Sequence, residues 1–72
     1  MSIVRFGNSN WYIFHNMNGY VSVYHIDNYD DIPYHYGKNI EEYIKKYPIN
    51  LSDYDKQELR ECLEYANGDW ES

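Results

Sequence analysis

The sequence predicts an α+β fold, in which a three-stranded antiparallel β-meander is followed by two α-helices packed on one face. Two observations lead to this class. Residues 1–26 alternate β-branched and aromatic side chains between turn residues, whereas residues 38–72 place apolar residues at helical spacing. The chain of 72 residues closes one modest core, so it is expected to be a single domain, which excludes a two-domain enzyme.

The meander is expected to contain strands at 3–6, 11–16 and 20–26. Asn18-Gly19 predicts a two-residue type I′ turn, because both residues tolerate a positive φ. With that turn, the core face holds two cross-strand pairs, Trp11 with Ile26 and Ile13 with Tyr24. Val4 and Phe6 of the first strand lie beside them. The other face then holds Ile3, Arg5 and His25 around a candidate dimer face, which consists of Tyr12, Phe14, Val21 and Val23.

Residues 27–37 show no periodicity and contain Pro33 and Gly37, which predicts an acidic, aromatic loop. Its carboxylates lack the spacing of a calcium-binding loop, so no metal site is predicted. We expect its side chains to contact a partner, and the candidate residues are Tyr29, Asp30, Asp31, Tyr34 and Tyr36.

The first helix is expected to begin after Asn39, which caps it together with Glu42 three residues later, and to end before Pro48. Its apolar side follows the helical repeat at Ile40, Tyr43, Ile44 and Tyr47. Its outer side predicts two i, i+4 ion pairs, Glu41–Lys45 and Glu42–Lys46.

The second helix is expected to begin after the N-cap Ser52 and to end at Asn67-Gly68. Its core side is Leu59, Cys62, Leu63 and Ala66. At 100° per residue, two tyrosines and two glutamates align on the opposite side. We call this set, Tyr54, Glu58, Glu61 and Tyr65, the acidic tyrosine stripe, and we expect it to bind a partner.

Twelve Asp and Glu against six Lys and Arg give a net charge of −6. This balance argues against binding of nucleic-acid phosphates by charge, and the absence of a long apolar run argues against a membrane span or signal peptide. A single Cys excludes an internal disulfide and suits a reducing cytoplasm. Solvated carboxylates are also an ordinary solubility device, which is the simplest alternative.

No catalytic pattern is visible in the sequence. The histidines His15, His25 and His35 are expected to be surface imidazoles, because no nucleophile lies at a recognisable spacing from them. Cys62 is expected to serve as a core residue. We therefore expect neither an enzyme nor a cofactor, although an enzyme using His25 or His35 stays an alternative.

Ten tyrosines in 72 residues exceed what so small a core encloses, which favours an interaction surface. With the acidic tyrosine stripe and the 27–37 segment, the chain resembles the small inhibitors that phages make against host defence, such as anti-CRISPR and anti-restriction proteins. The resemblance implies a nucleic-acid mimic that occupies the basic site of a nuclease in the host cytoplasm. Small bacterial immunity proteins share these features, and a homodimeric structural module is a further alternative.

Overall fold

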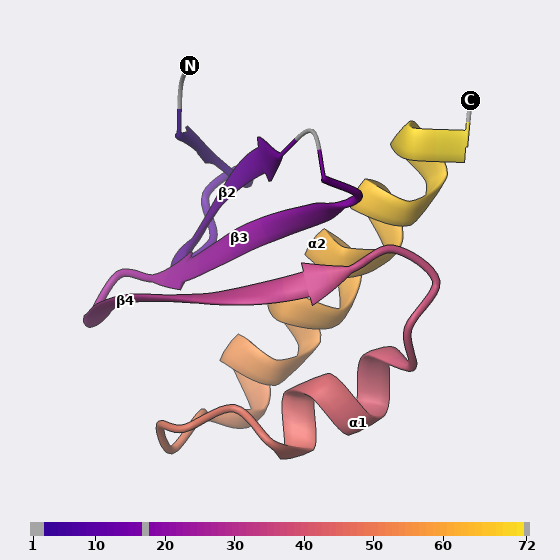
Figure 1. Cartoon of the computed structure of the whole chain (residues 1–72). Coiled ribbons are helices and arrows are strands. Elements are labelled where there is room, and N and C mark those ends of the chain that lie inside the picture. Colours follow the sequence, from indigo (N-terminus) through magenta and orange to yellow (C-terminus); the bar gives the residue numbers. More distant parts are fainter. Residues whose placement is uncertain (1–2, 17, 72) are drawn as a thin grey trace.

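The computed structural model describes residues 3–16 and 18–71, which form a four-stranded antiparallel sheet followed by two helices (Figure 1). The strands lie in chain order across the sheet: β1 (Val4–Arg5), β2 (Trp11–Asn16), β3 (Tyr20–His25) and β4 (Asn28–His35). The helices α1 (Ile40–Lys45) and α2 (Asp53–Glu71) both lie on one side of this sheet (Figure 1). The α+β class is confirmed, with one strand more than predicted.

Strand β4 occupies most of the segment predicted as a loop, so that prediction is wrong. Ile32 and Tyr34 turn toward the core, while Pro33 between them is exposed on an edge strand, where a missing N–H is tolerated. The pairing with β3 shifts between Val23 and His25, so that three residues of β4 oppose one residue of β3. This bulge interrupts the alternation and hides the strand from a search for periodicity.

Asn16 pairs with Tyr20, so the β2–β3 connection is one residue longer than the predicted two-residue turn. Ile13 pairs with Val23 and not with Tyr24. Gly19 in this loop adopts a φ of 85°, a conformation that glycine reaches without steric cost. The register therefore differs from the predicted one by a single residue.

This slip exchanges the two faces of β3. Val21 and Val23, predicted on the candidate dimer face, are fully buried under the helices. Tyr24 and Ile26, predicted in the core, are half-buried and 38% exposed respectively. The compact β-branched side chains fill the space beneath the helices, and the larger phenol ring stays on the outside.

The β1–β2 register agrees with the sequence. Val4 pairs with Ile13, and the N–H of Phe6 donates a hydrogen bond of 2.9 Å to the carbonyl of Trp11. Phe6 packs against the core, but Val4 is 56% exposed because β1 is a two-residue strand at the edge of the sheet.

Helix α1 begins as predicted, since the side chain of Asn39 accepts a hydrogen bond of 3.1 Å from the N–H of Glu42. Lys46 forms the expected ion pair with Glu42 at 2.8 Å. Glu41 instead pairs with Arg60 of α2, so this acid joins the two helices rather than two turns of one helix.

Helix α2 buries its predicted core side completely; these residues are Leu59, Cys62, Leu63 and Ala66. It does not stop at Asn67-Gly68 but continues to Glu71. The Asn67 side chain accepts a hydrogen bond of 3.3 Å from the N–H of Gly37 and donates one of 3.0 Å to the Tyr34 hydroxyl. Asn67 therefore fixes the helix to the β4–α1 connection and does not act as a cap.

Candidate interaction surfaces

The acidic tyrosine stripe lies on the surface of α2. Tyr54 and Tyr65 are 58% and 55% exposed, Glu61 is exposed, and Glu58 is half-buried. The Tyr65 ring lies 5.8 Å from the ring of Phe6, which precedes β2. Tyr65 therefore lies beside the β1–β2 connection. The sequence suggested a stripe directly opposite the core side of the helix, but this contact and the partial burial of Glu58 show that it lies partly against the rest of the molecule.

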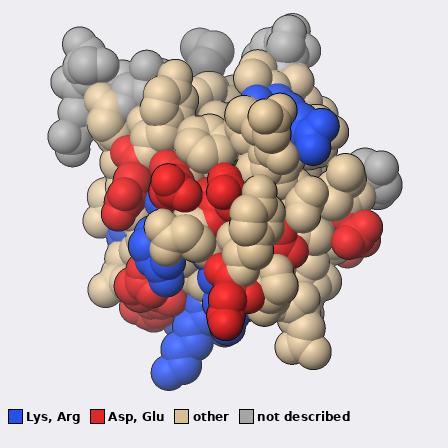
Figure 2. All heavy atoms as spheres, turned by 180° about the vertical axis from the view of Figure 1, so that it is seen from behind, with Lys and Arg blue, Asp and Glu red and all other residues tan. Residues whose placement is uncertain are grey.

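The charges of this stripe differ from those around α1. Within the described part of the chain, neither Glu58 nor Glu61 has a basic group within 4.0 Å, and both stay uncompensated. By contrast, the hydrogen bond from Arg60 lowers the pKa of Glu41, and that from Lys46 lowers the pKa of Glu42. Figure 2 shows carboxylates spread over the face behind the view of Figure 1, with a few basic groups among them.

The predicted contact residues of segment 27–37 do not form one surface. Tyr34 is 1% exposed, and its hydroxyl donates to the carbonyl of Lys38 at 2.6 Å, so it is a core residue and not a contact residue. Tyr36 packs against the core, and its hydroxyl lies 3.0 Å from Nδ1 of His15. Asp30 is exposed. The side chains of Tyr29 and Asp31 lie outside the described residues.

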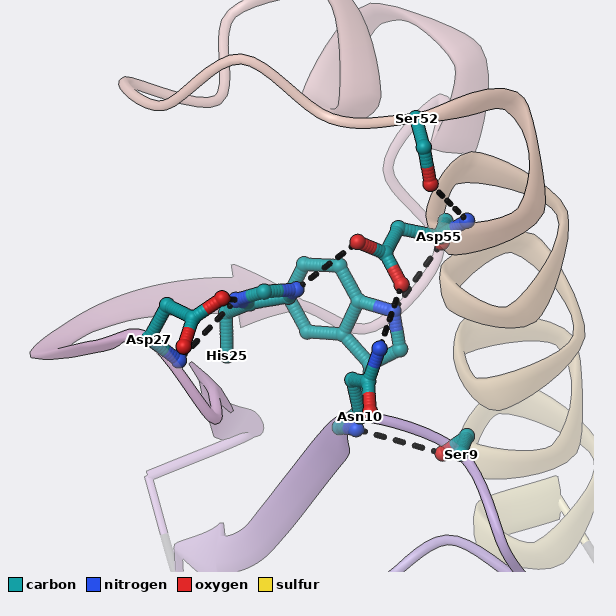
Figure 3. A network of polar contacts seen from close by, with 7 residues as sticks. Ser9, Asn10, His25, Asp27, Ser52 and Asp55 are labelled. Carbon is teal, nitrogen blue, oxygen red and sulfur yellow. Dashed lines mark hydrogen bonds and ion pairs between the residues drawn. The ribbon is translucent and has the colours of Figure 1, made fainter.

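A polar network, which sequence analysis missed, joins the start of α2 to the ends of β2 and β3 (Figure 3). The carboxylate of Asp55 accepts hydrogen bonds of 2.9 Å from Asn10 and from His25 Nε2. Its backbone carbonyl accepts a third, also of 2.9 Å, from the Trp11 indole, and its N–H donates to Ser52. One residue thus holds the helix N-terminus on the sheet.

His25 within this network is 4% exposed, so the prediction of a surface imidazole is wrong for this residue. The N–H of Asp27 donates to Nδ1 at 3.1 Å, which leaves the proton of the neutral ring on Nε2, facing Asp55. Partial burial alone raises the pKa of Asp55, but the hydrogen bonds from Asn10 and His25 outweigh it and lower the pKa below its usual value. The arrangement is a structural anchor, because both ring nitrogens are occupied.

The side of the sheet away from the helices carries an aromatic surface. We call it the open face, and the residues that the structure describes on it include Ile3, Arg5, Tyr12, Phe14, Tyr20, Ser22, Tyr24, Pro33 and His35. Tyr12 and Phe14 of the candidate dimer face lie here, half-buried, while Val21 and Val23 do not. A hollow of about 360 Å³ lies at one end, lined by Ile3, Tyr12, Tyr24, His25 and Ile26.

Neither a metal-binding cluster nor an accessible thiol is found among the described residues. No group of three or more His, Cys, Asp or Glu among them is placed to hold a metal ion. Cys62 is fully buried, and burial raises the pKa of its thiol to about 12. None of the described helices is long and apolar enough to cross a membrane. Comparisons with protein-family models, curated proteins and solved structures found no match.

Proposed function

We propose that the protein is a stoichiometric, non-enzymatic inhibitor of a nucleic-acid-binding enzyme or defence nuclease in the cytoplasm of a host cell. The acidic tyrosine stripe of α2 would occupy the basic groove of that target. The observation that supports this proposal is the exposure of Tyr54 and Tyr65 on either side of two uncompensated glutamates, Glu58 and Glu61.

The dimensions of the stripe suit such a groove. At about 1.5 Å per residue, Tyr54 and Tyr65 are separated by about 16 Å along the helix, the axial length of about five base pairs. Helix α2 is anchored at its start by Asp55 and near its end by Asn67. The side chains are therefore presented on a rigid element, which reduces the entropy lost on binding.

The two residue types have different roles in the proposed complex. Carboxylates steer the protein toward a basic surface and make association fast and salt-dependent. Tyrosines supply rigid contact area, which slows dissociation. Small bacterial immunity proteins that neutralise toxin nucleases resemble this chain in acidity and aromatic surface, so the proposal includes toxin nucleases as targets.

The test is a pull-down from host lysate with the wild-type protein and two charge-reversed variants. Glu58→Lys with Glu61→Lys alters the stripe, whereas Glu41→Lys with Glu42→Lys alters α1. Each double change moves the net charge from −6 to −2, because each substitution adds two positive charges. The two variants are therefore matched in overall charge.

We expect the wild-type protein to retain a nucleic-acid-binding protein at low salt and to release it at high salt. The α2 variant should retain about tenfold less of it or lower, and the α1 variant should behave like the wild type. Equal retention by all three proteins would show that the acidic tyrosine stripe is not part of the interface. Equal loss in both variants would show that only overall charge matters.

A further inference from the structure

The open face is covered by no part of the described chain, although it is largely aromatic. Tyr12, Phe14, Tyr20 and Tyr24 are half-buried there, beside the exposed His35. Ser22, at the centre of β3, is only 4% exposed among these larger neighbours. A partly exposed aromatic surface that its own chain leaves uncovered is a candidate docking site.

The charge of the open face indicates which kind of partner can bind there. None of the open-face side chains that the structure describes is acidic, although the whole chain carries a net charge of −6. Arg5 supplies the single formal positive charge among them, and it lies 6.0 Å from the centre of the Tyr12 ring. One cation gives too little attraction for a polyphosphate chain. The described side chains of two such faces can therefore approach each other without repulsion between carboxylates.

The hollow and Tyr20 lie on opposite sides of Ser22 along β3. Tyr20 and Tyr24 lie on β3 two residues before and after Ser22, and the hollow lies on the Tyr24 side. A twofold axis across the strands at Ser22 would place Tyr20 of one copy over the hollow of the other copy. The same axis keeps the two Arg5 side chains apart, because Arg5 shares the cross-strand row of Tyr12 and Tyr24.

The size of the molecule is compatible with such an interface. Its extents are 30 × 25 × 20 Å, so its broadest face spans about 750 Å² in projection, close to the roughly 800 Å² that each partner buries in a standard protein interface.

We propose that the open face is the interface of a twofold-symmetric homodimer, in which the sheets pack against each other and the helices lie outside. The acidic tyrosine stripes would then lie in the two outer layers, so that one dimer presents two target-binding surfaces. This inference does not depend on the proposed function, since it concerns the opposite side of the sheet.

Sedimentation velocity between about 1 and 100 μM tests the dimer, with two tyrosine variants as a matched pair. Tyr24→Lys places a charge in the open face, and Tyr54→Lys makes the same change on the outer surface of α2. We expect the wild-type protein and Tyr54→Lys to sediment as dimers, and Tyr24→Lys to lose at least about tenfold in association constant. Far-UV circular dichroism reports whether each variant is folded.

If Tyr24→Lys does not fold, His35→Glu replaces it, because His35 is exposed and its substitution does not disturb the core. This change should weaken the dimer as well. A wild-type monomer at 100 μM would overturn the proposal. A dimer that survives both open-face changes, or one that dissociates in Tyr54→Lys, would also overturn it by placing the interface elsewhere.

Discussion

The role of Asp55 as the anchor of α2 gives a quantitative prediction for stability. Its carboxylate is 13% exposed and accepts hydrogen bonds from Asn10 and from the buried His25. Replacement by Ala removes both bonds and leaves the Nε2–H of His25 without its acceptor. Loss of the bond from Asn10 should cost about 1 kcal/mol, the typical contribution of a hydrogen bond, and the unsatisfied donor of the buried His25 should cost about 1–3 kcal/mol. The free energy of unfolding should therefore fall by about 2–4 kcal/mol in Asp55→Ala.

The control is Asp53→Ala, which removes another first-turn acid of α2 but from an exposed site. Its cost should stay near 0.5 kcal/mol, which is typical of a surface charge at a helix N-terminus. Urea denaturation at pH 7, followed by circular dichroism, measures both changes. Equal destabilisation by Asp55→Ala and Asp53→Ala would refute the reasoning, because it would show that the network contributes nothing beyond the helix dipole.

The same residue makes stability depend on pH. The pKa of Asp55 is lowered in the folded protein, so its contribution is fully present above the unfolded value of about 3.8 and is lost as the pH falls through the folded value. The wild-type protein should therefore lose more stability between pH 5 and pH 3 than Asp55→Ala does. Parallel pH profiles for the two proteins would contradict this account.

Two further predictions concern buried groups. Burial raises the pKa of Tyr47 to about 12, and although the backbone of His25 approaches its hydroxyl, the geometry does not make a hydrogen bond. Tyr47→Phe should therefore leave the free energy of unfolding unchanged or raise it by up to about 1 kcal/mol. Tyr43→Phe removes a donor to the carbonyl of Ile32 and should lower the free energy of unfolding by about 0.5–1.5 kcal/mol. An equally large loss in both variants would disprove this difference. Cys62 should react with a disulfide reagent at pH 8 only after denaturant is added, and rapid labelling of the native protein would show that the α2 core is open.

The helical half of the molecule was predictable because its information is local. A repeat of 3.6 residues identifies the buried side of α2, and all four core residues proposed from it are fully buried. The same repeat predicted that Tyr54, Glu61 and Tyr65 are exposed, as they are, whereas Glu58 is half-buried. The predicted end of α2 was wrong because the Asn67 side chain accepts a hydrogen bond from Gly37, 30 residues away, and no local pattern reveals such a contact.

The sheet was less predictable because its pairing depends on single-residue choices. One extra residue in the β2–β3 loop exchanged the faces of β3 and turned the proposed valine surface into an aromatic one. The bulge in β4 concealed a strand that buries Tyr34. The network around His25 and Asp55 joins residues 30 positions apart, so only the folded structure brings it together.

The most direct test of the proposed mimicry is competition between nucleic acid and this protein for the target that the pull-down identifies. Fluorescently labelled nucleic acid is bound to the purified target, and the wild-type protein is added while anisotropy is recorded. We predict complete displacement of the nucleic acid at a stoichiometric ratio, with none from Glu58→Lys with Glu61→Lys. A ternary complex in which nucleic acid and this protein bind together would contradict the central claim.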